Sequence, residues 1–128
     1  MALEETVLNG EECDWCNLTE KQKKYLLFAT DFWSVYLADE QDYVGRCVLV
    51  LKRHCGSLPE LTEKEWLDMR YVVRRMESCF KSVLGATMCN WSCLMNSFYK
   101  ESPANPHLHL HVRPRLKNPI VINGNQYG

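Results

Sequence analysis

The sequence lacks an apolar run of the roughly 18 residues that a membrane-spanning helix needs. It also lacks a surplus of either charge, since 15 lysines and arginines stand against 16 aspartates and glutamates. The basic residues are scattered, apart from the pairs Lys52-Arg53 and Arg74-Arg75. The stripe of positive charge that a nucleic-acid backbone requires is therefore missing. We expect neither a membrane nor a nucleic-acid polymer as a partner.

Targeting and linker signals are scarce as well. The opening stretch MALEETVLNGEEC is acidic and has neither the basic nor the apolar region of a secretory signal. The seven cysteines are an odd number, and without a secretory signal they favour a reducing compartment where thiols stay free or bind metal. No repeat, low-complexity tract or linker divides the 128 residues. We therefore expect a single cytoplasmic domain over residues 1–128.

The apolar pattern predicts an α+β fold. Residues 62–84 carry apolar side chains at intervals of three and four, which predicts one long helix. Thr62 and Glu65 form a capping-box pattern at its start, and Gly85 is a natural stop. Strands are expected at residues 25–30, 32–38, 46–52 and 87–96 and along the histidines near 107–112. This order predicts an antiparallel sheet of about five strands covered by the helix, followed by an irregular tail at about 117–128.

The stretch NPHLHLHVRPR holds three of the chain's four histidines. In a strand, His107, His109 and His111 share one face, and the apolar residues between them anchor the other face in the core. Three interpretations follow from the spacing alone. The histidines form the exposed polar face of an amphipathic strand, or they bind a metal together, or one of them attacks phosphorus while a neighbour supports the developing charge.

Cys13 and Cys16, in the stretch CDWC, have polar neighbours and the spacing of a metal half-site. Taken alone, the pair is equally explained by coincidence, with a redox pair as a further alternative.

The stretch HLHLHV, followed by RPR, resembles the motif of the histidine triad (HIT) family, in which three histidines alternate with apolar residues. The long helix before the triad, the stretch GRCVLVLKRH and Asn96, eleven residues before His107, agree with that family. The resemblance spans roughly residues 13–115. It implies a HIT-like fold and a nucleotide hydrolase that cleaves at the α-phosphate of a dinucleoside polyphosphate or a nucleoside phosphoramidate.

The resemblance also implies roles for single residues. His109 matches the nucleophile, which forms a covalent nucleotidyl-histidine that water then cleaves. His111 would hydrogen-bond phosphate oxygens and contribute positive charge, and Asn96 would help hold the phosphate or the leaving group. The family further implies a homodimer, and Mg²⁺ is a candidate companion of the substrate phosphates.

The zinc-containing bacterial branch of the family begins with Cys-x-x-Cys. By resemblance, Cys13, Cys16, His54 and His107 would form a Cys₂His₂ zinc site, with the N-terminal part in a segment at about residues 10–18. Four nitrogen and sulfur ligands close a tetrahedron and leave no open position, so this zinc would be structural.

The chain departs from the family pattern at three substrate-binding positions. Arg46 follows Gly45 where most members have a histidine, and it either lies near the phosphate or faces solvent. The stretch SPANP replaces Gly-Gln-Ser/Thr-Val before the triad, which leaves Ser102 as the nearby hydroxyl. Asp39 is one position away from the usual ribose-binding residue and is otherwise a surface aspartate.

Two alternatives to the hydrolase follow from these observations. One is a nucleotide-binding protein of the same fold with weak or no catalysis, motivated by the changes at Arg46 and before the triad. The other is a metalloenzyme that holds zinc on all three triad histidines.

Overall fold

The computed structural model describes residues 13–95 and 104–128. In chain order the elements are α1 (Glu20–Lys23), β1 (Leu26–Ala29), β2 (Trp33–Leu37), β3 (Cys47–Leu51), the 3₁₀ turn η3 (Leu58–Glu60), α2 (Glu63–Leu84), β4 (Ala86–Ser92), β5 (His109–Leu116), β6 (Ile120–Ile122) and β7 (Asn125–Tyr127).

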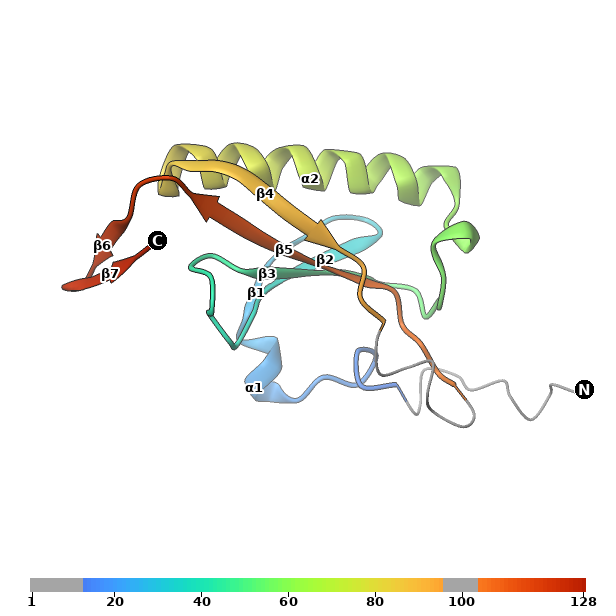
Figure 1. Cartoon of the computed structure of the whole chain (residues 1–128). Coiled ribbons are helices and arrows are strands. Elements are labelled where there is room, and N and C mark those ends of the chain that lie inside the picture. The colour runs from blue at the N-terminus through green and yellow to red at the C-terminus, as the bar shows by residue number, and fades with distance from the viewer. Residues whose placement is uncertain (1–12, 96–103) are drawn as a thin grey trace, which may run out of the picture.

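Five strands form one antiparallel sheet in the order β1-β2-β3-β5-β4. Helix α2 lies across one face of this sheet, and the chain that leads from Cys13 into α1 lies against the other (Figure 1). We call these the helix face and the open face. The expected α+β architecture, with five strands and one long helix, is confirmed.

Helix α2 begins and ends where the sequence predicts. The Thr62 hydroxyl accepts a hydrogen bond from the Glu65 amide, and the Glu65 carboxylate accepts one from the Thr62 amide. Gly85 ends the helix in the left-handed region at φ 70°, where glycine pays no steric cost. Glu65 is buried, and two hydrogen bonds from Arg53, which follows β3, compensate the burial of its carboxylate.

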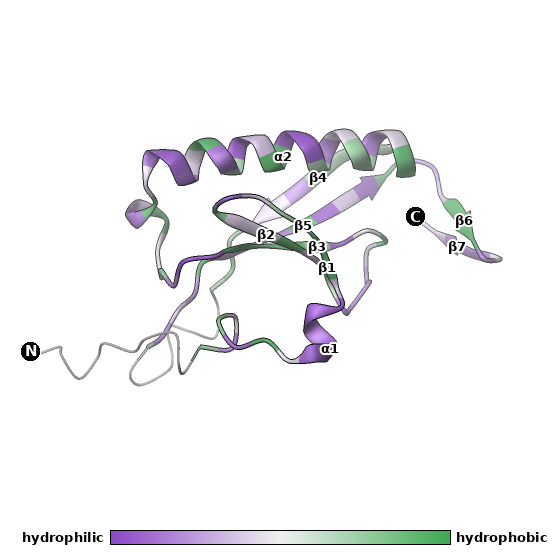
Figure 2. Cartoon of the chain, turned by 180° about the vertical axis from the view of Figure 1, so that it is seen from behind, coloured by the Kyte–Doolittle hydropathy of each residue, from purple (hydrophilic) through white to green (hydrophobic). Residues whose placement is uncertain are grey.

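The main core lies between α2 and the sheet. Along β5 and the residue before it, Leu108, Leu110 and Val112 pack into this core, as the alternation predicts. Figure 2 shows the apolar segments on the sheet side of α2 and in the central strands. A smaller apolar cluster forms on the open face from Ala38, Val48 and Val50, with Trp15 and Tyr36 packed against it.

The C-terminal tail differs from the expectation of an irregular segment. Strands β6 and β7 form a hairpin, and the two residues between them, Asn123 and Gly124, have positive φ values of 51° and 81°. Asn-Gly with positive φ is the turn that best matches the twist of a two-residue hairpin. The glycine and asparagine residues that suggested irregularity therefore make the turn.

The triad strand and its neighbour β4 begin and end at other residues than expected. Strand β4 ends at Ser92 rather than near residue 96, and β5 begins at His109, so His107 precedes the strand. No helix in residues 13–95 or 104–128 is long and apolar enough to span a membrane.

Candidate functional site

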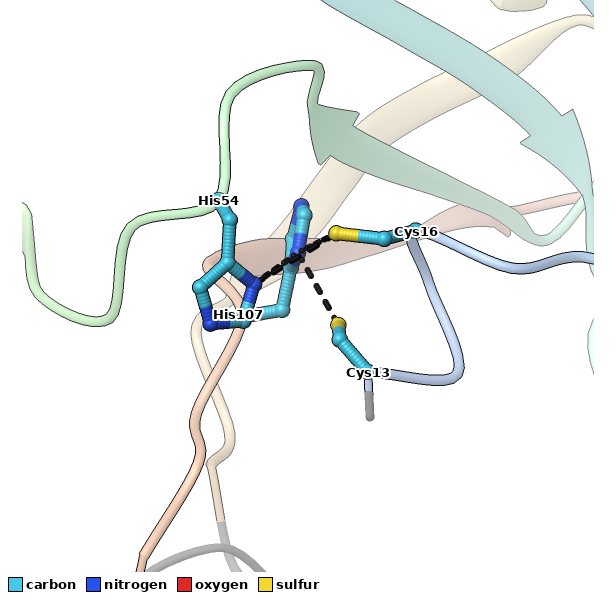
Figure 3. Close-up of side chains that lie close together, drawn as sticks. All are labelled: Cys13, Cys16, His54 and His107. Atoms are coloured by element: carbon cyan, nitrogen blue, oxygen red, sulfur yellow. Dashed lines mark hydrogen bonds between the residues drawn. The ribbon is translucent and has the colours of Figure 1, made fainter. Parts of the chain in front are cut away.

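Four side chains from three separate parts of the chain converge where β3 ends and β5 begins (Figure 3). Cys13 and Cys16 lie in a turn in which the Cys16 amide donates to the Cys13 carbonyl at 3.2 Å. His54 follows β3, and His107 precedes β5. The ligand atoms of all four lie within 4.8 Å of one another. We call these residues the Cys₂His₂ cluster.

Hydrogen bonds on the outer side fix which nitrogen each histidine presents to the cluster. Nε2 of His107 lies 2.6 Å from the Leu51 carbonyl, and Nε2 of His54 lies 2.8 Å from Oδ1 of Asn105. Both oxygens only accept, so both Nε2 atoms carry the proton. Each neutral ring therefore directs the lone pair of Nδ1 inward, with an outer partner of the kind that orients metal-binding histidines.

The cluster has the size and chemistry of a tetrahedral zinc site. Nδ1 of His107 lies 3.2 Å from Sγ of Cys13, 3.4 Å from Sγ of Cys16 and 3.2 Å from Nδ1 of His54. Metal–ligand distances of about 2.0–2.3 Å give tetrahedral edges of roughly 3.3–3.8 Å. The two Nδ1 atoms face each other without a proton between them, and a cation relieves that repulsion. The donor set therefore fits zinc, held by four residues with no open position.

The ionisation of Cys16 and of His107 is linked to metal binding. Burial, together with the neighbouring Cys13, raises the pKa of the Cys16 thiol to about 11. Burial is also the main cause that lowers the pKa of His107. A bound cation would favour both the thiolate and the neutral imidazole, so zinc binding would release the proton of Cys16.

His109, the middle triad residue, is oriented by the backbone. Its Nδ1 lies 2.8 Å from the His107 carbonyl, so Nδ1 carries a proton and Nε2 is the nitrogen that can present a lone pair. The ring is 6% exposed and lies between two others, with centroid distances of 5.4 Å to Trp15 and 5.3 Å to His111. An imidazole held this way has one nitrogen suited to nucleophilic attack.

His111 is held by Arg46. Nη2 of Arg46 lies 3.4 Å from Nδ1 of His111, and Nη1 lies 3.0 Å from Oδ1 of Asp42. A guanidinium only donates, so Nδ1 of His111 accepts and its Nε2 carries the proton. Burial, followed by the neighbouring His109 and the positive charges of Arg46 and Arg113, lowers the pKa of His111 to about 4. The positive charge that the resemblance suggested for His111 therefore lies on Arg46, and His111 offers a neutral N–H donor.

A pocket of about 620 Å³ lies on the open face between the α1 segment and strands β2 and β3. His111 and Arg46 line one end, and Asp39 lies on the wall with Trp15 and Tyr36. The structure thus brings Arg46 and Asp39 to the cavity beside the triad. Asn96 and Ser102, the other two expected substrate-binding residues, lie outside the described residues.

The described residues support neither zinc bound by all three triad histidines nor a protein-bound Mg²⁺. His107 points its Nδ1 into the Cys₂His₂ cluster, whereas Nδ1 of His109 binds a carbonyl, so one zinc on all three triad histidines does not fit. Within residues 13–95 and 104–128, the Cys₂His₂ cluster is the only group of three or more metal-binding side chains. The expected Mg²⁺ therefore has no support there.

Sequence reasoning missed two residues near the triad. Trp15 stacks on both His109 and Tyr36, and its place inside the CDWC motif was the available signal. Ser92 lies opposite His111 in the pairing of β4 with β5, and its hydroxyl is buried without a hydrogen-bond partner in the described part of the chain. Strand register is not readable from one sequence, so nothing in the sequence marked Ser92.

Comparisons with known proteins match this chain through its structure and not through its sequence. No protein-family model matches the chain, and no curated protein sequence matches it. A Zn-bound histidine triad family protein from Mycobacterium smegmatis matches 86% of this chain with 79% of its own, at 17% identity and a TM-score of 0.64. A Plasmodium falciparum diadenosine triphosphate hydrolase, solved with cyclomarin A, matches 78% of this chain with 67% of its own, at 16% identity and a TM-score of 0.63.

A HIT-like protein from Bartonella henselae matches 73% of this chain with 70% of its own, at 14% identity and a TM-score of 0.58. These identities are low, and the likeness concerns the backbone. The chain therefore has the histidine triad fold, as the motif predicted.

Proposed function

We propose that the protein is a nucleotide hydrolase that cleaves at the α-phosphate of a dinucleoside polyphosphate or a nucleoside phosphoramidate. The observation that carries this proposal is the hydrogen bond from Nδ1 of His109 to the His107 carbonyl, which leaves Nε2 as the nucleophilic nitrogen. The pocket beside the triad offers space for a nucleoside. The Plasmodium protein that shares the fold is a diadenosine triphosphate hydrolase.

The proposed reaction has two steps. Nε2 of His109 attacks the α-phosphorus, a P–N bond forms, and the P–O or P–N bond to the leaving group breaks. An amine leaving group takes up a proton as it departs, whereas a polyphosphate leaves as an anion. Water then attacks the same phosphorus, the P–N bond to His109 breaks, and the water's proton leaves with solvent. Two displacements replace one difficult hydrolysis.

Arg46 and His111 would stabilise the phosphate as its negative charge develops. Nε2–H of His111 is a neutral donor, and Arg46 adds a fixed positive charge beside it. Asp39 would bind ribose hydroxyls from the pocket wall. Asn96 and Ser102 remain predicted phosphate-binding residues.

Zinc in the Cys₂His₂ cluster would act structurally. Cys13, Cys16, His54 and His107 would hold it, and it would supply the charge that keeps both cysteines as thiolates. His107 links the cluster to the catalytic strand, because its own carbonyl accepts a hydrogen bond from Nδ1–H of His109. A homodimer and a cytoplasmic location are further parts of this proposal.

The second candidate is a nucleotide-binding protein without efficient turnover. It is favoured by the segment just before the triad, where Asn105 hydrogen-bonds His54 rather than facing the substrate pocket. In the family motif, the segment before the triad supplies phosphate-binding groups. The two candidates differ only in chemistry, so one assay separates them.

The deciding experiment measures AMP release from diadenosine tetraphosphate, diadenosine triphosphate and adenosine phosphoramidate. We expect His109→Ala to reduce kcat at least about a thousandfold on whichever is cleaved. Its thermal melting and metal content should match the parent chain, which shows that the fold survives. Turnover by the variant at the parent rate would refute the nucleophile, and nucleotide binding without any AMP release would favour the second candidate.

A further inference from the structure

The triad strand continues as a row of cations. Because side chains alternate along β5, Arg113 and Arg115 lie on the open face with His109 and His111. Arg46 comes just before β3, where the β3–β5 register places it next to Arg113. We call Arg46, Arg113 and Arg115 the arginine row. It starts at His111 and extends about 13 Å along the strand at the usual rise of about 3.3 Å per residue.

One aromatic ring holds the far end of the row. The guanidinium of Arg115 lies 4.9 Å from the centroid of Tyr43, and that of Arg113 lies 6.0 Å from the same centroid. Nη1 of Arg115 also donates to Oδ1 of Asn90 at 2.8 Å. These contacts order both side chains without neutralising them.

Carboxylates are few along the row. Arg46 has Asp42 at 3.0 Å and Glu40 at 4.0 Å, whereas no carboxylate in the described residues lies within 4.0 Å of Arg113 or Arg115. The charge of Arg113 reaches its neighbours, because it helps lower the pKa of both Asp42 and His111. Like charges gathered on one ring repel each other, and an anion placed over them removes that cost.

We propose that the arginine row binds the polyphosphate, with Arg46 at the α-phosphate and Arg113 and Arg115 at the phosphates beyond it. The chain would then prefer nucleotides with a long polyphosphate to nucleoside phosphoramidates. This inference rests on the proposed function for the position of the α-phosphate at His109 and His111. The nucleoside pocket lies over β2 and β3, and the row leads away from the triad along β5. The polyphosphate of the leaving group then lies along the guanidiniums, which match phosphate oxygens in geometry and charge.

Binding measured as a function of phosphate number tests this inference. AMP, ADP, ATP and adenosine 5′-tetraphosphate are titrated into the full chain by calorimetry at low salt, in a His109→Ala background that prevents turnover. We expect affinity to rise about tenfold or more from AMP to the tetraphosphate. In Arg113→Gln/Arg115→Gln this gain should fall to about twofold, and Arg113→Lys/Arg115→Lys should keep part of it because the charge remains.

The matched control is Arg70→Gln/Arg74→Gln, which removes the same charge from exposed positions on α2, on the other face of the sheet. This control should keep the full gain. An equal gain in the Arg113/Arg115 double glutamine variant and its parent, with both folded by thermal melting, would overturn the inference and leave the proposed function standing. If no adenine nucleotide binds, the proposed function fails, and inorganic tripolyphosphate used as the titrant still tests the row.

Discussion

At the residue scale, hydrogen-bond direction divides three histidines that look equivalent in the sequence. His107 donates from Nε2 to a carbonyl and presents Nδ1 to the Cys₂His₂ cluster. His109 donates from Nδ1 and leaves the Nε2 lone pair. His111 accepts at Nδ1 and donates from Nε2. Each partner is a group with a fixed hydrogen-bond role, so the tautomers follow from the contacts.

Arg46 is the residue whose role changes most once the contacts are known. Its side chain is 14% exposed, and it contacts His111 rather than facing solvent alone. Burial is the main cause that lowers the pKa of His111, and the permanent cation beside Nδ1 adds to it. The ring therefore stays a neutral donor across pH 5 to 8, about the range in which histidines usually titrate. Arg46 therefore supplies the positive charge at this site, and His111 supplies a neutral hydrogen-bond donor.

The first prediction concerns this pair. In Arg46→Gln the positive charge is lost, so the pKa of His111 should rise from about 4 towards the ordinary value of 6.5. Burial and His109 still lower the pKa in this variant, so His111 should gain its proton below pH 6.5 but at a higher pH than in the parent. An NMR titration of the ring measures this directly, with His111→Asn to assign the signal.

Arg46→Lys keeps the charge and should keep the pKa of His111 low. Arg70→Gln on α2 is the control for a change in net charge alone. If His111 titrates at the same pH in Arg46→Gln and in the parent, Arg46 does not set its protonation.

At the element scale, the turn between Cys13 and Cys16 does more than close a metal site. It carries Trp15 to within 5.4 Å of the His109 ring and 6.2 Å of the Tyr36 ring. The turn itself has few backbone contacts, so the four ligands supply much of what holds it against the sheet. The Cys₂His₂ cluster, Trp15 and His109 are therefore linked through one short segment.

The second prediction tests this coupling. Cys13→Ser should abolish stoichiometric zinc, lower the melting temperature by several degrees and weaken nucleotide binding, because Trp15 loses its fixed position. Atomic emission gives the metal content, and tryptophan fluorescence with and without AMP reports on Trp15. Cys79→Ser, an exposed thiol on α2, is the matched control and should change none of these. Retention of zinc in Cys13→Ser would contradict the cluster.

The elements show which features one sequence makes predictable. Helix α2 was predictable to the residue because its capping box and glycine stop are local signals. The triad strand was predictable from alternation, but its pairing partners were not, since register depends on contacts between distant residues. The contact between Trp15 and His109 joins residues 94 apart and left no local pattern. The tail was expected to be irregular, whereas Asn123 and Gly124 form the turn of the β6–β7 hairpin, because a turn signal predicts a hairpin only where the flanking segments are recognised as strands.

At the scale of the whole molecule, the sheet leaves two edges. Strand β1 is one and β4 is the other. Strand β4 has seven residues against four in β1, and Met88 in β4 is 55% exposed. A long edge strand with an exposed apolar side chain is a natural site for pairing with another chain. Two copies related by a two-fold axis would extend the sheet through β4 and bury apolar surface on both.

The last prediction is that the chain is a homodimer joined through β4. Light scattering after size exclusion should give twice the chain mass of 15.0 kDa. Met88→Lys places like charges close to each other across the two-fold axis and should give a monomer. Leu27→Lys adds the same charge at the β1 edge, where Leu27 is 54% exposed, and should remain dimeric. A monomeric parent would refute the dimer. If the Met88→Lys variant is still a dimer, the interface does not lie at β4.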